Sequence, residues 1–438
     1  MAKPKNQKPP FALRALAAFA VTLAALFVLL LAAYALPGEP VRDHVYDSAV
    51  KIAGEGLYPE YLNFKLFQMD NYTDTIMLTE AASADEAPPL TAMMTNTAYN
   101  VDNFETLADD LQWYIERDWA TGAQRTDAPA LVPFSYARYW HGYLIWLRPL
   151  LLVTDITGVR VVQYLVLAAL FAAVAVLLRR RCGLRAAVWF AVSQLLVTAF
   201  WAPHQVQFFT CFAVAYAGCV WVLAKPRRSD DVCLALLVLG VVTSFCDLLV
   251  TPVLPLGLPL VCWLLEPQQR LRAGTRQCGI VVGGSLTWGV GYLLCWASKW
   301  VLAGLVTGQN VIADALHQVG VRTGADSWHG MELTWGNILH FVYTTLAAKH
   351  LFWPLVLAVV LLLALFAASI RDRQQLARAL PLGLCALMAP AWFIVLRTHS
   401  IQHGWFTWRA LGLTVFAGLA FLYYCCDVRQ IAKRLKRT

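Results

Sequence analysis

Long apolar runs separated by short polar connections fill most of the chain. The first run covers residues 11–36, and Arg14 is its only charged residue. A membrane-spanning helix needs about 20 mostly apolar residues, because the hydrocarbon core of a bilayer is about 30 Å thick. The pattern therefore predicts about ten spans. The nine that follow the first are residues 159–178, 186–201, 208–224, 232–245, 251–265, 278–305, 350–370, 380–396 and 410–427.

The first run has two interpretations. Ala33-Tyr34-Ala35 resembles a signal-peptidase site, which would make the run a cleaved signal peptide. The apolar stretch is much longer than the roughly 7–15 residues of a signal-peptide core. We therefore expect an uncleaved membrane anchor.

Positively charged residues gather in every second connection. Cytoplasmic loops collect Lys and Arg, so these clusters indicate which side is inside. They predict a multi-pass plasma-membrane protein with both termini in the cytoplasm and the long connection after the first span outside. The six clusters lie within residues 3–8, 179–185, 225–228, 270–276, 371–378 and 433–437.

Composition and charge support a membrane protein with one water-soluble insert. The chain is 59% hydrophobic and 14% charged, whereas soluble domains are about 45–50% apolar and about 25% charged. This excludes an ordinary cytosolic enzyme and a disordered protein. Residues 37–138 hold 17 of the 27 acidic and 6 of the 35 basic residues, so their net charge is −11 and that of the remainder is +19. The overall charge of +8 is therefore no sign of a nucleic-acid partner.

The predicted fold class is an all-α multi-pass membrane protein in three parts. Residues 1–36 form the N-terminus and first span, residues 37–157 an extracytoplasmic loop, and residues 158–438 a bundle of about nine helices. Within the loop, residues 43–53 predict an amphipathic helix, because Val45, Ala49 and Ile52 share one face. The eleven cysteines lie in or beside the apolar spans and predict no disulfide framework.

The apolar segment at residues 144–153 is expected to lie at the membrane interface rather than cross it. A span here would invert every later loop and break the pattern of basic clusters. The aromatic residues around it fit the headgroup level of a membrane. At that depth Arg138 and Arg148, with His141 beside them, can bind a phosphate; the alternative is an ordinary aromatic anchor with basic flanks.

The acidic loop contains two carboxylates with the spacing of one helical turn. Asp70 and Asp74 are four residues apart, so they share a face of a helix. Together with Asn71, Tyr72 and Thr73, they can bind a metal, accept a proton from a hydroxyl group or hold the hydroxyls of a sugar. The alternative is that Asp70 or Asn71 simply caps the helix that begins here.

Two further segments carry candidate chemistry. Asp247 precedes a proline-rich run that predicts a broken helix. An ionisable residue at such a break is a functional-site candidate; the alternative is that Asp247 lies in the outer turn.

In the last outer loop, His399 and His403 are four residues apart, and Arg409 follows. The two histidines can bind a divalent metal only with a third ligand from elsewhere. A phosphate-and-sugar site or an interfacial aromatic belt fits this loop better.

The polar chemistry thus collects at the predicted outer surface, and apart from Asp247 the middles of the spans carry no charge. A channel or secondary transporter would place charges or paired broken helices near mid-membrane. The pattern favours an enzyme or carrier that acts on a lipid headgroup.

The order of a first span, a large outer loop with acidic residues and interfacial helices, and many short-looped spans resembles the GT-C superfamily of membrane glycosyltransferases. The segments 69–78, 139–148, 247–259 and 399–409 also resemble those of uncharacterised multi-pass bacterial envelope proteins. The resemblance implies transfer of a sugar from a polyprenyl-phosphate donor to a glycan or protein acceptor at the outer face. In that family the acidic residue lies soon after the first span, which would point to Asp43 or Asp47.

The resemblance assigns roles to the candidate residues. Asp70 and Asp74 would act as base or position the acceptor, with Asp43 as reserve. Arg138, Arg148, His399, His403 and Arg409 would hold the phosphate, with His141 and Asp247 as further binding residues. Two other classes stay open: a non-catalytic flippase or exporter of a lipid-linked glycan, and a structural scaffold subunit.

Overall fold

The computed structural model describes residues 9–63, 67–100, 132–246, 249–270, 272, 274–323, 332, 334–348 and 373–426, with a few positions between 352 and 364. Asp247 and most of the predicted span at residues 350–370 lie outside the described residues.

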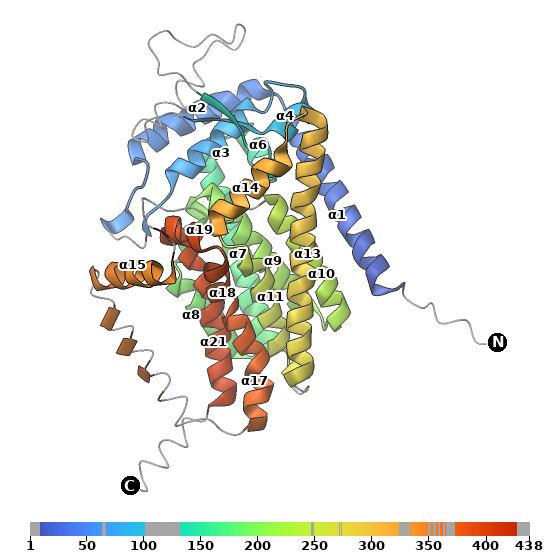
Figure 1. The fold of residues 1–438 in the computed structure, drawn as a ribbon, viewed down its shortest axis with the longest axis vertical. Coiled ribbons are helices and arrows are strands. Elements are labelled where there is room, and N and C mark those ends of the chain that lie inside the picture. Colours follow the sequence, from blue (N-terminus) through green and yellow to red (C-terminus); the bar gives the residue numbers. More distant parts are fainter. Residues whose placement is uncertain are drawn as a thin grey trace, which may run out of the picture.

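Long apolar helices form the body of the protein (Figure 1). Among the described residues, seven helical segments are long and apolar enough to cross a membrane. They and two shorter apolar helices coincide with nine of the predicted spans, so the prediction of a helical membrane protein is confirmed. The seven are α1 (Phe11–Tyr34), α7 (Ile156–Cys182), α9 (Val206–Ala224), α10 (Ser229–Cys246), α13 (Gly274–Thr307), Arg373–Val395 and Trp408–Cys425. The shorter two are α8 (Leu184–Leu196) and α11 (Val253–Leu265).

Two of the long segments consist of more than one element. Arg373–Val395 comprises α17 (Arg373–Ala386) and α18 (Met388–Val395). Trp408–Cys425 comprises the short helix η5 (Trp408–Ala410) and α21 (Leu411–Cys425).

The centre of the bundle is α11, whose residues are all buried. A helix that is apolar on every side must be surrounded by other helices. Beside it, α10 and α13 pack backbone to backbone: a Cβ at Gly240 would lie 2.2 Å from the Trp288 carbonyl oxygen. Small residues allow such an approach between membrane helices.

A layer of short elements lies across one end of the bundle (Figure 1). We call it the cap. The amphipathic helix predicted at residues 43–53 is part of α2, and Val45, Ala49 and Ile52 are buried as expected. The helix at residues 144–151 is too short to span, as predicted, whereas the two-stranded antiparallel sheet was not predicted. The cap comprises α2 (Gly38–Glu55), η1 (Tyr61–Asn63), α3 (Asn71–Ser83), α4 (Pro89–Thr95), β1 (Thr97–Asn100), β2 (Val132–Ser135) and α6 (Leu144–Leu151).

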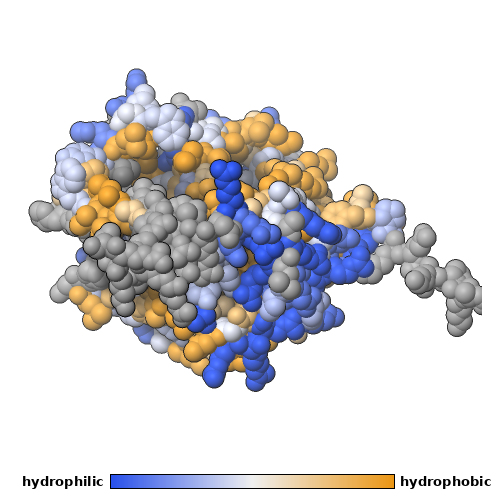
Figure 2. Space-filling view, turned by 90° about the horizontal axis from the view of Figure 1, so that it is seen from below, coloured by the Kyte–Doolittle hydropathy of each residue, from blue (hydrophilic) through white to orange (hydrophobic). Residues whose placement is uncertain are grey.

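Hydrophilic residues gather over part of the opposite end of the bundle (Figure 2). There α7 ends with Arg179, Arg180 and Arg181 in its last turn. We call this end the basic end. Two more helices follow α13 along the chain: α14 (Val311–Thr323) and α15 (Trp335–Ala348).

Candidate functional site

Asp70 is the N-cap of α3 and is buried beneath the cap. Its carboxylate accepts hydrogen bonds from the Thr73 backbone N–H at 3.0 Å and from the Gln207 side-chain amide at 2.8 Å. The capping role considered from the sequence is therefore real. Burial raises the pKa of Asp70, although these hydrogen bonds act in the opposite direction.

Asp74 is fully buried one turn further along α3. Its Oδ1 accepts hydrogen bonds from the backbone N–H groups of Val206 at 3.1 Å and Gln207 at 3.4 Å, the first two residues of α9. Because α9 has no side-chain cap of its own, Asp74 caps it from another helix. Burial raises the pKa of Asp74 to about 7, against the lowering effect of the Arg160 charge.

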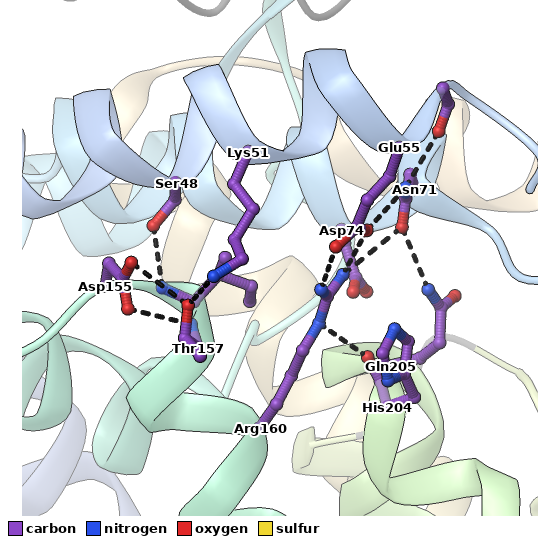
Figure 3. A network of polar contacts seen from close by, with 12 residues as sticks. Ser48, Lys51, Glu55, Asn71, Asp74, Asp155, Thr157, Arg160, His204 and Gln205 are labelled. Carbon is purple, nitrogen blue, oxygen red and sulfur yellow. Dashed lines mark hydrogen bonds and ion pairs between the residues drawn. The ribbon is translucent and has the colours of Figure 1, made fainter.

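An arginine from α7 joins these elements (Figure 3). Arg160 donates to both carboxylate oxygens of Glu55 at 2.5 and 2.9 Å, and to the carbonyl of His204 at 3.0 Å. Asn71 donates to Glu55 at 3.1 Å and accepts from Gln205 at 3.2 Å. The network thus ties α2, α3 and α7 to the turn that leads into α9.

That turn is η4 (Ala199–His204), and its histidine is neutral. Burial, followed by the Arg160 charge, lowers the pKa of His204 to about 4. The His204 ring nitrogen Nε2 lies 2.9 Å from the Tyr61 hydroxyl. Because the imidazole is neutral, it does not compete with Arg160 for Glu55, whose carboxylate pairs with this guanidinium.

Arg409, in η5, is fully buried and has an unusual environment. None of its three guanidinium nitrogens has a hydrogen-bond partner among the described residues. Its Cζ lies 4.7 Å from the centre of the Phe208 ring and 5.4 Å from that of Trp408. A buried cation needs a counter-charge or hydrogen bonds, and aromatic faces supply only part of that requirement. The arrangement therefore fits a binding site for an anion.

Consecutive residues of α9 connect the carboxylates to this arginine. Gln207 donates to Asp70, and Phe208 packs under Arg409. The first turn of α9 thus contacts the cap acids on one side and the unpaired cation on the other. Three hydroxyls without hydrogen-bond partners among the described residues, those of Thr210, Thr251 and Thr398, are buried in neighbouring segments.

His399 and His403 extend the cation side of the site. They lie in and just after α19 (Arg397–Gln402), with ring centres 4.6 Å apart. The ring of His403 packs on Phe406 of α20 (Gly404–Thr407), which contacts Phe208 in turn. Burial, with the charge of Arg322, lowers the pKa of His399 and that of His403, the latter to about 4.

His399 orients an arginine rather than facing an anion directly. Its Nε2 lies 2.9 Å from the Leu249 carbonyl, to which it donates, and its Nδ1 therefore accepts from Arg322 at 2.8 Å. Leu249 lies in the break between α10 and α11, in a left-handed conformation. Instead of the broken helix predicted from the prolines, α11 runs through Pro255 and Pro259 as one helix, and His399 is the partner of a carbonyl in the turn that precedes it.

The other predicted residues lie apart from this cluster. Asp43 is exposed on α2. Arg138 forms an ion pair with Asp314 of α14 at 3.2 Å. His141 lies 2.8 Å from the buried carboxylate of Glu80. Arg148 is fully buried and donates to the Leu36 carbonyl at 2.8 Å and to that of Ala81. His141 and Arg148 thus join elements of the cap, and Arg138 joins the cap to α14.

Sequence reasoning missed two buried cations. Arg160 lies in the first turns of the span α7, and Lys299 lies in α13, where it donates to Asn96 at 2.6 Å. Both are ionisable residues inside an apolar run, which was the available signal. Their partners Glu55 and Asn96 are more than 100 residues away in the sequence and carried no signal.

Among the described residues, no group of three or more His, Cys, Asp and Glu side chains could hold a metal ion. The eleven cysteines are free. Comparison of this chain with models of known protein families, with curated proteins and with solved structures finds no match.

The pKa of Asp74 predicts a pH-dependent stability. Since folding raises this pKa from about 3.9 to about 7, the folded state binds more protons than the unfolded state between these values. Stability contributed by this group is therefore present at low pH and is lost as the pH rises towards 7, with a slope of up to about 1.4 kcal/mol per pH unit. Thermal unfolding of the purified protein between pH 5 and 8 measures this slope.

The variant Asp74→Asn should show a smaller fall in melting temperature over that range, because it does not ionise. Asp47→Asn, on the exposed face of α2, is the matched control and should follow the wild type. Equal slopes in wild type and Asp74→Asn would contradict the prediction.

Arg160 is expected to stabilise the joint between the cap and the bundle. Arg160→Met removes charged hydrogen bonds to Glu55 and should lower the free energy of unfolding by about 2 kcal/mol. Lys51→Met is the control, since Lys51 also reaches from α2 to α7, at Thr157, but is exposed and should change stability by less than about 0.5 kcal/mol. Denaturant titration compares the two variants, and equal losses would refute the role of Arg160.

Proposed function

We propose that this protein is a membrane glycosyltransferase of the GT-C type, with its cap on the outer side of the plasma membrane and both termini in the cytoplasm. It would move a sugar from a polyprenyl-phosphate donor to a glycan or protein acceptor in cell-envelope assembly. The observation that carries the proposal is the first turn of α9. It contacts the buried acid Asp70 and also Arg409, a buried cation with no hydrogen-bond partner among the residues that the structure describes.

Arg409 holds the phosphate of the donor. Its guanidinium is desolvated and without hydrogen-bond partners among the described residues, so an incoming phosphate supplies both the missing charge and the missing acceptors. Leaving such a cation unpaired is costly, and this cost favours binding of an anionic substrate. Arg322, oriented by His399, adds a second positive charge to this side of the site.

Asp70 takes the proton of the acceptor hydroxyl. The charge of Asp70, and not that of Asp74, helps to raise the pKa of Tyr58 and that of Tyr72. Tyr58 is an exposed residue of the cap. A raised pKa makes Asp70 a better base than an ordinary carboxylate. Asp74 is occupied by the backbone of α9 and positions that helix.

The reaction is a direct displacement. The acceptor oxygen forms a bond to the anomeric carbon as its proton passes to Asp70, and the bond between that carbon and the phosphate oxygen breaks. The electron pair leaves with the lipid phosphate, whose negative charge Arg409 stabilises. Such a leaving group requires positive charge rather than a general acid.

An apolar cavity of about 220 Å³ is suited to the first isoprene units of the donor lipid. It lies between α7, α8, η4 and α9, and its wall includes Tyr164, Gln194 and Pro203. Tyr164 is one turn from Arg160, and a Cβ at Gly412 would lie 3.4 Å from the Gln194 amide nitrogen. Residues that line the cavity thus lie next to the Arg160 network and next to α21.

The test uses the full chain in proteoliposomes that contain a radiolabelled polyprenyl-phosphate sugar. A glycosyltransferase releases polyprenyl phosphate and labels the acceptor in a one-to-one ratio. Movement of intact donor between leaflets without release would support the flippase or exporter instead. Lipid-linked intermediates that accumulate in a deletion strain identify the sugar.

A further inference from the structure

A second cavity, with a partly polar lining, lies at the basic end, far along the bundle from the cap. It has a volume of about 340 Å³ and lies between the end of α11, the short helix α12 (Pro267–Arg270), α13, α17 and α21. Its polar lining consists of Gln269, Arg270, Gln277, Gln375, Arg378 and Tyr424. Cavities of this size hold small organic ligands.

The lining carries two positive charges. Arg270 and Arg378 contribute guanidinium groups, and no carboxylate lines the cavity among the described residues. The acid that precedes α12, Glu266, already forms an ion pair with Arg181 at 2.7 Å. Arg270 is held in place by a hydrogen bond to the Tyr424 hydroxyl and by its position 5.1 Å from that ring. The cavity therefore attracts an anion.

Two buried polar atoms of the lining residues have no partner among the described residues. One is Nε of Arg270, a donor, and the other is Oε1 of Gln277, an acceptor. The Gln277 side chain is fixed, because its Nε2 donates to Gln269 at 3.0 and 3.1 Å. Buried polar atoms are satisfied in native proteins, so both atoms point to a ligand. The ligand must accept from arginine and donate to an amide oxygen.

We propose that this cavity binds a phosphate ester that also carries a hydroxyl group, such as the glycerophosphate headgroup of an anionic phospholipid or a free glycerol phosphate. The phosphate binds Arg270 and Arg378, since guanidinium groups fork onto phosphate oxygens. The hydroxyl donates to Gln277 Oε1. Basic pockets between membrane helices are suited to anionic headgroups. The cavity shares no lining residue with the site at the start of α9, so this proposal does not depend on the proposed function.

The experiment uses the full chain, purified in detergent and stripped of lipid. In one arm, native mass spectrometry measures binding of phosphatidylglycerol against phosphatidylcholine, which lacks the hydroxyl. In the other arm, thermal shift measures binding of glycerol 1-phosphate and inorganic phosphate. Arg270→Gln and Arg378→Gln should each weaken binding at least tenfold. Gln277→Leu should weaken binding of the hydroxyl-bearing ligands several-fold and leave inorganic phosphate unchanged.

The matched control is Arg185→Gln. Arg185 makes the same kind of contact with Tyr423 that Arg270 makes with Tyr424, but it is exposed and does not line the cavity. Arg378 is exposed at the cavity, so its variant keeps the test valid if Arg270→Gln does not fold. Binding in the lipid arm alone identifies a headgroup, and binding in the soluble arm identifies a free ester. Wild-type binding by both arginine variants in both arms, or an equal loss in Arg185→Gln, overturns the proposal.

Discussion

Replacing Arg409 with Gln is expected to reduce sugar transfer about 10²- to 10³-fold in proteoliposomes. In the proposed reaction the buried cation Arg409 stabilises the leaving phosphate, and loss of one such donor in other enzymes has an effect of this size. Arg409→Lys should retain part of the activity, because it keeps the charge but not the forked geometry. Initial rates with the labelled donor measure both variants.

The same substitution should make the protein more stable in the absence of substrate. An unpaired buried charge is unfavourable, so Arg409→Gln should raise the melting temperature of the ligand-free protein while activity falls. Arg227→Gln, an arginine that stacks on Trp221 at the basic end, is the control and should leave transfer unchanged. A stable Arg409→Gln variant with wild-type activity would exclude the phosphate role.

Replacing Asp70 with Asn is expected to reduce transfer about 10²- to 10⁴-fold, the range for loss of a general base. Asn retains an oxygen that caps α3 at Thr73, so the fold should persist. The loss should appear in the maximal rate with little change in donor affinity, because in the proposed reaction Asp70 acts on the acceptor proton. Titration of the donor at saturating acceptor separates the two quantities.

Asp43→Asn decides between the two possible positions of the base. The family resemblance points to a residue soon after the first span, whereas Asp43 is exposed on α2 and Asp70 is buried beside α9. Glu39→Gln, also exposed on α2, is the matched control. Loss of activity in Asp43→Asn with retention in Asp70→Asn would reverse the assignment and leave the anion site at Arg409 unaffected.

The sequence predicted the acids and histidines of the candidate site but not their partners. Asp70 and Asp74 could be found because their four-residue spacing places them on one helical face, and His399 and His403 for the same reason. Their partners could not be found. Gln207 binds Asp70 through its side chain, and Val206 binds Asp74 through its backbone N–H. At the start of an apolar helix, neither residue stands out in the sequence. Nothing local distinguishes Arg148, which binds backbone carbonyls, from Arg409, which has no partner among the described residues.

The sequence by itself determined the membrane helices, the amphipathic face of α2 and the boundary between α10 and α11. These are local properties: the length of an apolar run, the period of a helix and the position of prolines can each be read within one segment. The tertiary structure alone decided which carboxylates are buried, that Arg160 joins the cap to the bundle and that Arg409 finds no hydrogen-bond partner in the part of the chain that the structure describes. Those outcomes depend on contacts between residues more than 100 positions apart, such as that of Asp70 with Gln207, because the charge state and partners of a side chain are set by its surroundings in the folded protein.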